Sequence, residues 1–247
     1  MRVNGVSFSI ASHAAWAPGV ATQQAWDEWW RAPFRIAAGV EPAVAAMPAL
    51  LRRRAGFLGK MALQVAYQCL DGRTDIPTVF CSRHGEVARA VDLLSELAQS
   101  SAVSPTGFGL AVHNASAGLF SIARKDRANH LALAAGNSTI EHAVIDACGL
   151  LADGAPMVLL VAYDQALPPV LAQFQDSDEQ PYAWAWLMVP AQAQNGAIHL
   201  NWSSSASAAG PGDAMPAGLE VLRFQLSGQA RLERVAGRRR WCWSRDV

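Results

Sequence analysis

Leu-Ala-Leu-Ala-Ala-Gly-Asn-Ser-Thr-Ile-Glu-His-Ala-Val-Ile-Asp-Ala-Cys-Gly-Leu-Leu, residues 131–151, is a short apolar run that leads directly into a helical pattern. Its first part, Leu131 to Ala135, predicts a strand of small residues. The apolar side chains after it recur at helical spacing, at Ile140, Ala143, Val144, Ala147, Cys148 and Leu151. Ser138 and Glu141 have the S-x-x-E spacing of a capping box, which favours a helix beginning there. The stretch therefore predicts a strand that runs into a capped helix.

Strands and helices alternate on both sides of this stretch. Pro156 to Tyr163 is almost continuously apolar, as expected for a strand covered on both faces. Upstream we expect a strand over residues 3–11, a helix around Trp26–Trp30, a helix over 58–70 and a strand over 76–81. After these we expect a helix with Val87, Val91, Leu94 and Leu97 facing inward, a strand from Pro105 through Val112, and a helix over 114–123. This alternation predicts a layered α/β domain.

The last third of the chain has a different pattern. Tyr182 to Val189 alternates between two faces, which predicts a strand antiparallel to its neighbour. We expect further strands at Ile198–Trp202 and Arg240–Arg245, a mobile loop over 203–218, and a helix over 217–227. Four tryptophans in these strands either pack on one another or form a partner-facing patch: Trp184, Trp186, Trp241 and Trp243.

Composition excludes several classes of protein. The 247 residues include 20 Lys+Arg and 20 Asp+Glu, so no excess positive charge favours nucleic acid or a membrane surface. With 51% hydrophobic and 16% charged residues, the chain is not a disordered polar polypeptide. Apolar runs such as Met157 to Ala162 are too short to span a membrane, and residues 1–16 make a poor signal peptide. Four cysteines without a C-x-x-C pair favour a reducing compartment, so we expect a cytoplasmic protein.

Motifs for cofactors and metals are missing from the sequence. Gly107-Phe-Gly109 lacks the third glycine of a dinucleotide loop, and Gly136-Asn-Ser138 does not complete a G-x-S-x-G nucleophile elbow. The histidines are scattered over different elements, at His84, His113, His130 and His142. We therefore expect neither a cofactor nor a metal.

Two places are unusual enough to bear chemistry. In Phe80-Cys-Ser-Arg-His-Gly85, Cys81 with His84 is a possible activated thiolate; the alternative is a core thiol followed by a surface turn. In Ala134-Ala-Gly-Asn-Ser-Thr139, backbone N–H groups at the helix start favour negative charge; the alternative is a plain joint with Ser138 as the cap.

These places belong to a larger pattern, formed by Ser104-Pro-Thr-Gly-Phe-Gly-Leu-Ala-Val-His-Asn-Ala-Ser-Ala-Gly-Leu-Phe-Ser-Ile122 and Ala132-Leu-Ala-Ala-Gly-Asn-Ser-Thr139. Together with Ser-Arg-His-Gly at 82–85 and Val-Ala-Tyr-Asp at 161–164, they resemble the N-terminal half of β-ketoacyl synthases of the thiolase fold. The chain is more similar still to the short β-ketoacyl synthase-like proteins of aryl-polyene and related pigment clusters. The resemblance covers residues 1–170 and implies a thiolase-like layered fold, with 171–247 as a divergent, β-containing extension packed on the same domain.

The resemblance also identifies the position of the nucleophile. The family's motif before the catalytic cysteine corresponds to His113-Asn-Ala-Ser-Ala-Gly-Leu-Phe-Ser-Ile122, and pairing the sequences from there puts Asn137 in the cysteine's place, or Gly136 with a slip of one residue. Neither side chain is a thiol, and nothing after residue 170 resembles the half that carries the family's two catalytic histidines. Condensation needs a thiolate and oxyanion donors, so the resemblance implies a subunit without catalytic residues of its own.

In this superfamily a synthase without its cysteine is often a chain-length factor that pairs with a catalytic ketosynthase. We therefore expect a non-catalytic subunit of polyene or fatty-acid-type synthesis. By the same resemblance the dimer would form around the strand before the nucleophile helix, with His113, Asn114, Leu131, Leu133 and Ala135 at the partner interface. The small residues of this strand are equally consistent with an internal strand.

Two other functions remain open at this point. One is a stand-alone acyltransferase or thioesterase that uses Cys81 and His84. The other is a homodimeric scaffold that binds acyl carrier protein through Arg52-Arg-Arg54 and Arg238-Arg-Arg240, although such basic runs are more often solvated surface.

Overall fold

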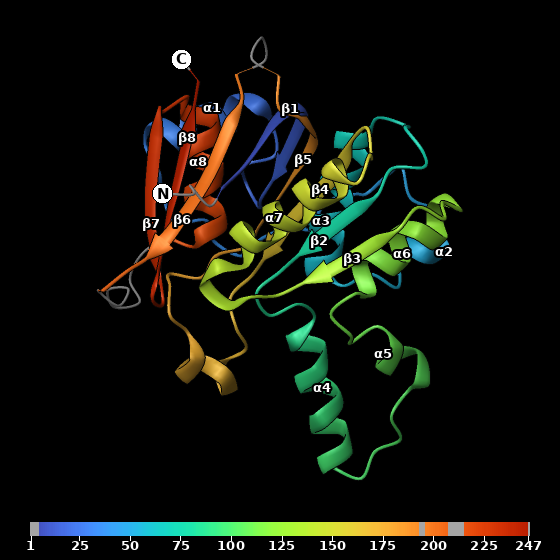
Figure 1. Cartoon of the computed structure of the whole chain (residues 1–247). Helices are drawn as coiled ribbons and strands as arrows, with labels where there is room; N and C mark the ends of the chain where they lie inside the picture. The colour runs from blue at the N-terminus through green and yellow to red at the C-terminus, as the bar shows by residue number, and fades with distance from the viewer. Residues whose placement is uncertain (1–4, 193–195, 207–214, 247) are drawn as a thin grey trace.

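The computed structural model of the chain describes residues 5–192, 196–206 and 215–246. A single mixed sheet of eight strands runs through this part of the chain, in the order β3-β2-β4-β5-β1-β6-β8-β7 (Figure 1). Its strands are β1 (Gly5–Trp16), β2 (Thr78–Cys81), β3 (His130–Leu133), β4 (Val158–Asp164), β5 (Tyr182–Pro190), β6 (Ile198–Ser204), β7 (Arg231–Ala236) and β8 (Arg239–Arg245). The segments before and after residue 170 therefore share one sheet.

The helices are α1 (Gln23–Arg31), α2 (Ala49–Arg52), α3 (Phe57–Leu70), α4 (Val87–Ala98), α5 (Pro105–Gly109), α6 (Ala115–Arg124), α7 (Thr139–Ala152) and α8 (Ala217–Ser227), with short 3₁₀ segments at Gly136–Ser138 and Pro169–Phe174. On one face of the sheet, α7 packs against β2 and β4, and α1 packs against α8. On the other face, α3 packs against β1, β4 and β5, with α6 beside it. This arrangement confirms the predicted layered α/β fold.

Side-chain alternation in the central strands explains why both faces are covered. In β5, Trp184 and Trp186 lie in the core under α7 and α8, whereas Ala183, Ala185 and Leu187 lie in the core under α3. Every residue from Tyr182 to Met188 is consequently buried. The predicted antiparallel strand is confirmed, because β5 pairs antiparallel with both β1 and β4.

The tryptophans pack on one another inside the protein. Trp184, Trp186, Trp241 and Trp243 all have 0% exposure. The ring centroids of Trp184 and Trp186 are 4.4 Å apart, and those of Trp186 and Trp243 are 6.4 Å apart. The indole N–H of Trp184 donates to the Gly218 carbonyl oxygen at 2.9 Å. These side chains therefore belong to the core and do not form a partner-facing patch.

Several predicted elements were wrong or missing. The strand expected from Pro105 through Val112 is the short helix α5, because Ser104 Oγ accepts from the Gly107 N–H at 3.2 Å and proline suits a first helical turn. Strand β7 had no prediction at all. The loop expected over 203–218 is shorter at both ends, since β6 extends to Ser204 and α8 begins at Ala217; residues 207–214 lie outside the described residues.

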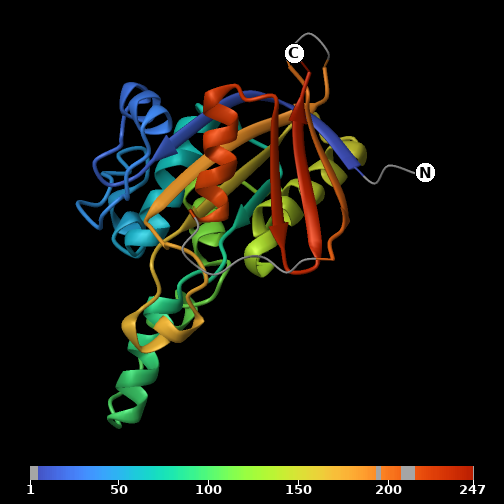
Figure 2. The ribbon, with the colours of Figure 1, turned by 90° about the vertical axis from the view of Figure 1, so that its left-hand side faces the viewer.

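Helix α4 exists as predicted, but the prediction that its apolar side chains face inward was wrong. None of its residues is buried, and Leu94 and Leu97 are 63% and 61% exposed. Figures 1 and 2 show α4 extending away from the sheet, with α5 at its side in Figure 1. The periodicity correctly marked an amphipathic helix, but it could not show that no element in the described part of the chain covers the apolar face.

Candidate functional site

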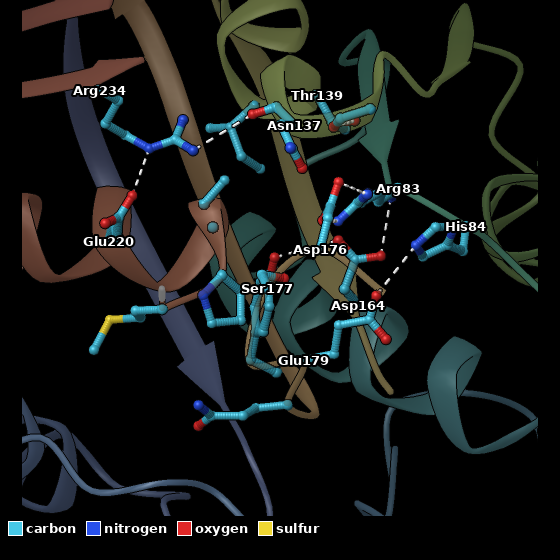
Figure 3. A pocket seen from close by; sticks show the side chains of 18 of the residues that line it. Arg83, His84, Asn137, Thr139, Asp164, Asp176, Ser177, Glu179, Glu220 and Arg234 are labelled. Atoms are coloured by element: carbon cyan, nitrogen blue, oxygen red, sulfur yellow. Dashed lines mark hydrogen bonds and ion pairs between the residues drawn. The ribbon is translucent and has the colours of Figure 1, made fainter. Parts of the chain in front are cut away.

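A pocket of about 410 Å³ lies beyond the ends of the parallel strands β2 and β4. Its walls come from the turn after β2, the end of β4, the loop before β5, the starts of α7 and α8, and β7 (Figure 3). Edges where parallel strands end are common ligand sites in α/β folds, because helix N-termini and loops converge there. This pocket is therefore the candidate functional site.

The start of α7 places Asn137 in the pocket wall. Gly136 has φ of +56°, in the left-handed region that glycine adopts without strain, and it begins the 3₁₀ turn Gly136–Ser138. Thr139 Oγ1 accepts from the Ala135 N–H at 2.9 Å and donates to the Gly136 carbonyl oxygen at 2.7 Å. The Thr139 side chain thus holds this turn in place, and Asn137 lines the cavity.

The predicted capping box is wrong. Ser138 makes no cap bond to the α7 backbone; its hydroxyl instead accepts from the Trp241 indole N–H at 3.0 Å. Glu141 does not reach back to Ser138 either, because its side chain is 0% exposed and pairs with Arg234. Long-range partners from β7 and β8 take both side chains, which local spacing could not indicate.

Arg234 connects three elements around the pocket. Its guanidinium contacts Glu141 of α7. It also donates from Nε to Glu220 Oε2 of α8 at 2.6 Å and to the Asn137 carbonyl oxygen at 3.4 Å (Figure 3). The Trp243 indole N–H also approaches Glu141 Oε1, at 3.4 Å. This network fixes the start of α7 relative to β7 and α8.

The turn after β2 explains the Ser-Arg-His-Gly motif. Ser82 Oγ donates to Asp164 Oδ1 at 2.8 Å and accepts from the Gly85 N–H at 2.8 Å. The ring N–H at His113 Nε2 donates to the Ser82 carbonyl oxygen, also at 2.8 Å. Gly85 has φ of +56°, and a Cβ added there would lie 2.7 Å from His113 Cδ2, so no larger residue fits. The motif builds a compact turn that holds β2, β4 and the start of α6 together.

Charged side chains line the pocket, mostly in pairs. Burial raises the pKa of Asp164 to about 6, although this carboxylate also accepts from the Arg83 N–H at 2.9 Å and from the Tyr182 hydroxyl at 3.3 Å. Arg83 forms an ion pair with Asp176. His84 Nε2 lies 3.4 Å from Glu179 Oε1, and both side chains line the pocket (Figure 3). Among the described residues, no group of three or more His, Cys, Asp or Glu side chains could hold a metal ion.

Among the residues that the structure describes, no thiol lines this pocket. Cys81 is 0% exposed in the core, and burial raises the pKa of its thiol well above the usual range, with the nearby Asp164 carboxylate acting in the same direction. A buried, protonated thiol is a poor nucleophile, so the geometry disfavours the pair Cys81 and His84 as catalytic residues. Burial also raises the pKa of Cys148, to about 12, on the apolar face of α7.

The residues expected at a partner interface lie on or near the outer edge of the sheet. Strand β3 is the terminal strand, paired with β2 on one side only, and Leu131 on it is 41% exposed. Leu133 packs partly against the core, and Asn114 is exposed at the start of α6. His113 and Ala135 are half-buried. Of the two positions considered for this strand, internal or outer, the structure places it at the edge.

Some residues of the site had no signal in the sequence. Arg234 and Glu220 come from the last third of the chain, and Asp176 and Glu179 come from the loop before β5. Single charged residues in irregular segments resemble ordinary surface positions. Only the fold brings Arg234 and Glu141, 93 residues apart, into contact.

Comparison with known families agrees with this geometry. The model of the family described as "Beta-ketoacyl synthase, N-terminal domain" matches residues 26–244. The chain belongs to this family. The match confirms the resemblance seen in the sequence, and it extends past residue 170 through most of the last third of the chain. A search of curated proteins finds no matching relative.

Solved structures show the same fold. A chain in the structure of the ketosynthase ApeO in complex with its chain length factor ApeC, from Xenorhabdus doucetiae, has 25% sequence identity and a TM-score of 0.85, covering 97% of this chain and 99% of that chain. The ishigamide ketosynthase/chain length factor has 16% identity and a TM-score of 0.62, covering 81% of this chain and 68% of that chain. A β-ketoacyl synthase from Burkholderia phymatum STM815 has 12% identity and a TM-score of 0.62, covering 90% of this chain and 69% of that chain. The thiolase-like ketosynthase fold is therefore confirmed for this family member.

No helix in the described part of the chain is long and apolar enough to cross a membrane.

Proposed function

We propose that this protein is a chain-length-factor-like subunit that pairs with a catalytic ketosynthase and has no condensing activity of its own. The observation that carries the proposal is Asn137 at the start of α7, facing the pocket where the family resemblance puts the nucleophile. A carboxamide cannot hold an acyl group as a thioester, and no described thiol lines the cavity. Condensation would then require the thiol of another polypeptide.

The matched complex supports a partner of this class. The ApeO–ApeC structure is that of a ketosynthase with its chain length factor, and its matching chain is nearly equal in length to this one. By analogy, this subunit would complete a heterodimer and shape the tunnel that limits the length of a polyene or fatty-acid-type product. The analogy gives the class of partner; the edge of the sheet suggests where the partner binds.

The two outer strands of the sheet differ in a way that favours β3 as the dimer edge. The other outer strand, β7, carries Arg231 and Glu233 on its exposed side, and charges on an edge discourage strand pairing. Strand β3 instead presents Leu131 at 41% exposure. We infer that β3 pairs with the corresponding strand of the ketosynthase, with His113, Asn114, Leu133 and Ala135 around it.

Co-expression tests this proposal. The chain is produced in turn with each catalytic ketosynthase of its own organism, and the complex is measured by size-exclusion chromatography and by affinity for the immobilised partner. We expect one heterodimer peak, and Leu131→Lys should weaken it because a charge would be buried at the interface. Val40→Lys is the matched control, since Val40 is 84% exposed in the loop before α2. A wild-type chain that migrates separately from the ketosynthase would overturn the proposal.

Acyl carrier protein is a second proposed partner, favoured by one observation. Arg238, Arg239 and Arg240 are all exposed at the turn between β7 and β8, close in sequence to the pocket residue Val235. Three cations at this turn would attract an acidic carrier surface. Carrier binding to the heterodimer should weaken as salt rises, and should weaken further in Arg238→Ala/Arg240→Ala. Salt-independent carrier binding would contradict this contact.

A further inference from the structure

A serine, a histidine and an aspartate form a hydrogen-bonded row at the start of β6, in the half of the sheet remote from β3 (Figure 1). Ser7 Oγ lies 2.8 Å from His199 Nδ1, and His199 Nε2 lies 3.0 Å from Asp246 Oδ1. None of the three residues lines the pocket at the start of α7. A hydroxyl bonded to an imidazole that a carboxylate orients is the arrangement that activates serine as a nucleophile.

Regular sheet structure positions this row. Strands β1 and β6 are antiparallel, with Ser7 directly opposite His199 although the two residues are 192 positions apart in sequence. Phe8, the next residue on β1, is buried in the core, so Ser7 and His199 point to the other face of the sheet. The Asp246 N–H donates to the Ala197 carbonyl oxygen at 3.1 Å, which holds this aspartate beside the start of β6.

The partners of the imidazole set its tautomer. The Asp246 side chain is 56% exposed, and an exposed carboxylate is ionised at neutral pH and only accepts hydrogen bonds. The ring proton of His199 therefore lies on Nε2. Nδ1 then carries a lone pair and accepts from the Ser7 hydroxyl. The imidazole is thus ready to take the serine proton, and the carboxylate stabilises the imidazolium that results.

A carboxamide lies beside the serine on the same face of the sheet. Asn201 is two residues after His199 on β6 and is directly opposite Gly5 of β1. A Cβ on Gly5 would collide with the Asn201 Oδ1, so the carboxamide rests on β1 where the glycine leaves room for it. Gly5 is two residues from Ser7 on the same strand face. The amide of Asn201 therefore places a hydrogen-bond donor next to the serine, where an oxyanion would form.

We propose that Ser7 is an activated nucleophile that hydrolyses small esters with a good leaving group, such as aryl esters. Its Oγ attacks the carbonyl carbon while its proton moves to Nδ1 of His199. The bond to the aryl oxygen then breaks, and the proton passes to that oxygen, so a phenol leaves. Water attacks the acyl-serine, again giving a proton to His199, which returns it to Oγ as the carboxylic acid departs. Ser7 and His199 would be catalytic residues, and Asp246 a positioning residue.

This inference goes beyond the proposed function and does not depend on it. The row is separate from the pocket that contains Asn137 and from the β3 edge. Ester hydrolysis at Ser7 supplies no thioester, so the proposed lack of condensing activity is unaffected. Ser7→Ala should accordingly bind a ketosynthase as the wild type does, which keeps the two proposals separately testable.

Covalent labelling tests the activation of Ser7. The full-length chain is treated with a fluorophosphonate, which transfers its phosphonyl group to an activated serine with loss of fluoride, and the adduct is located by peptide mass spectrometry. We expect the label on Ser7, with a rate that falls roughly 100-fold in His199→Ala, at the lower end of what a positioned base contributes. Ser203 is exposed on the same face of β6 and is the control. It should stay unlabelled, and Ser203→Ala should label at the wild-type rate.

Two further variants separate a chemical role from a structural one. Added imidazole should restore part of the Ser7 labelling in His199→Ala, because a free base can enter the space that the side chain leaves. Asp246→Asn should slow labelling by about tenfold or more, since an amide can hold the wrong tautomer, and Asp246→Glu should recover part of the rate. Urea denaturation of each variant should give the wild-type midpoint.

Hydrolysis of p-nitrophenyl acetate provides the readout of turnover. The wild type and Ser203→Ala should hydrolyse it at equal rates, and Ser7→Ala should lose the activity that the wild type has above the buffer. An absent Ser7 adduct in the wild type, or equal labelling in the wild type and His199→Ala, would overturn the inference. Labelling that is lost in His199→Ala without rescue by imidazole would show a structural role and would also contradict it.

Discussion

Removing the guanidinium of Arg234 should cost more stability than removing any exposed arginine. Arg234→Met keeps most of the apolar stem but leaves Glu141, which has 0% side-chain exposure, without its cation. Glu220 and the Asn137 carbonyl oxygen would lose a donor as well. Breaking one side of a buried pair typically costs about 3–5 kcal/mol, because the remaining charge stays desolvated. We expect a loss in this range in the free energy of unfolding.

The assay is urea denaturation followed by tryptophan fluorescence, which reports on the buried indoles beside Glu141. The matched control is Arg231→Met on the same strand, whose side chain is 65% exposed in its pair with Glu233. We expect the control to keep the wild-type midpoint, because water screens exposed ion pairs. In Arg234→Met, the further change Glu141→Gln should restore part of the lost stability, since it removes the orphaned charge. A loss below about 1 kcal/mol for Arg234→Met would refute the reasoning that a buried network fixes the start of α7.

Three further predictions concern the pocket and the turn after β2. The pKa of Asp164 is raised from 3.8 to about 6 on folding, so the contribution of this group to stability is complete below pH 4 and is lost as the pH rises through 6, by up to about 3 kcal/mol. Asp164→Asn should remove this pH dependence of the free energy of unfolding, measured by denaturation from pH 4 to 7. An unchanged slope would contradict the prediction. Gly85→Ala should cost more than Gly154→Ala in the same assay, because both have positive φ but only Gly85 would bring a Cβ to 2.7 Å from His113; equal losses would refute the steric argument. Asn137→Cys should gain one thiol that iodoacetamide modifies rapidly near pH 7, since a thiol at a helix start has a lowered pKa. Peptide mapping of the wild type should find Cys81 unmodified. A slow reaction at position 137 would show that this position does not open to the pocket.

Periodicity predicted the central elements of the fold because they bury complete faces. Helix α3 has an apolar period of 3.6 residues, strand β5 alternates, and the continuous apolar run of β4 suits a short strand covered on both faces. The errors come from segments without such a constraint. The run 105–112 has no covered face to specify a strand, and its Ser-Pro start favours the helix that is found.

The candidate site was predictable only at its centre. The resemblance placed Asn137 at the start of α7, and that residue does line the pocket. The residues that hold it there, Arg234 and Glu220, are far away in sequence and lie on elements of the last third of the chain. The exposure of Leu94 and Leu97 was unpredictable for a related reason, because an amphipathic pattern shows that a face is apolar but not which polypeptide covers it.

The central claim is that condensation requires a thiol from another polypeptide. The most direct measurement is mass spectrometry of intact protein and of peptides. This chain, alone and paired with a ketosynthase that binds it, is first incubated with acyl-loaded carrier protein and extender. We predict that the acyl adduct and the elongated product appear only in the paired sample, with the adduct on the ketosynthase. A covalent acyl group on this chain, near residue 137 or on Cys81, or elongation by the chain alone, would contradict the account.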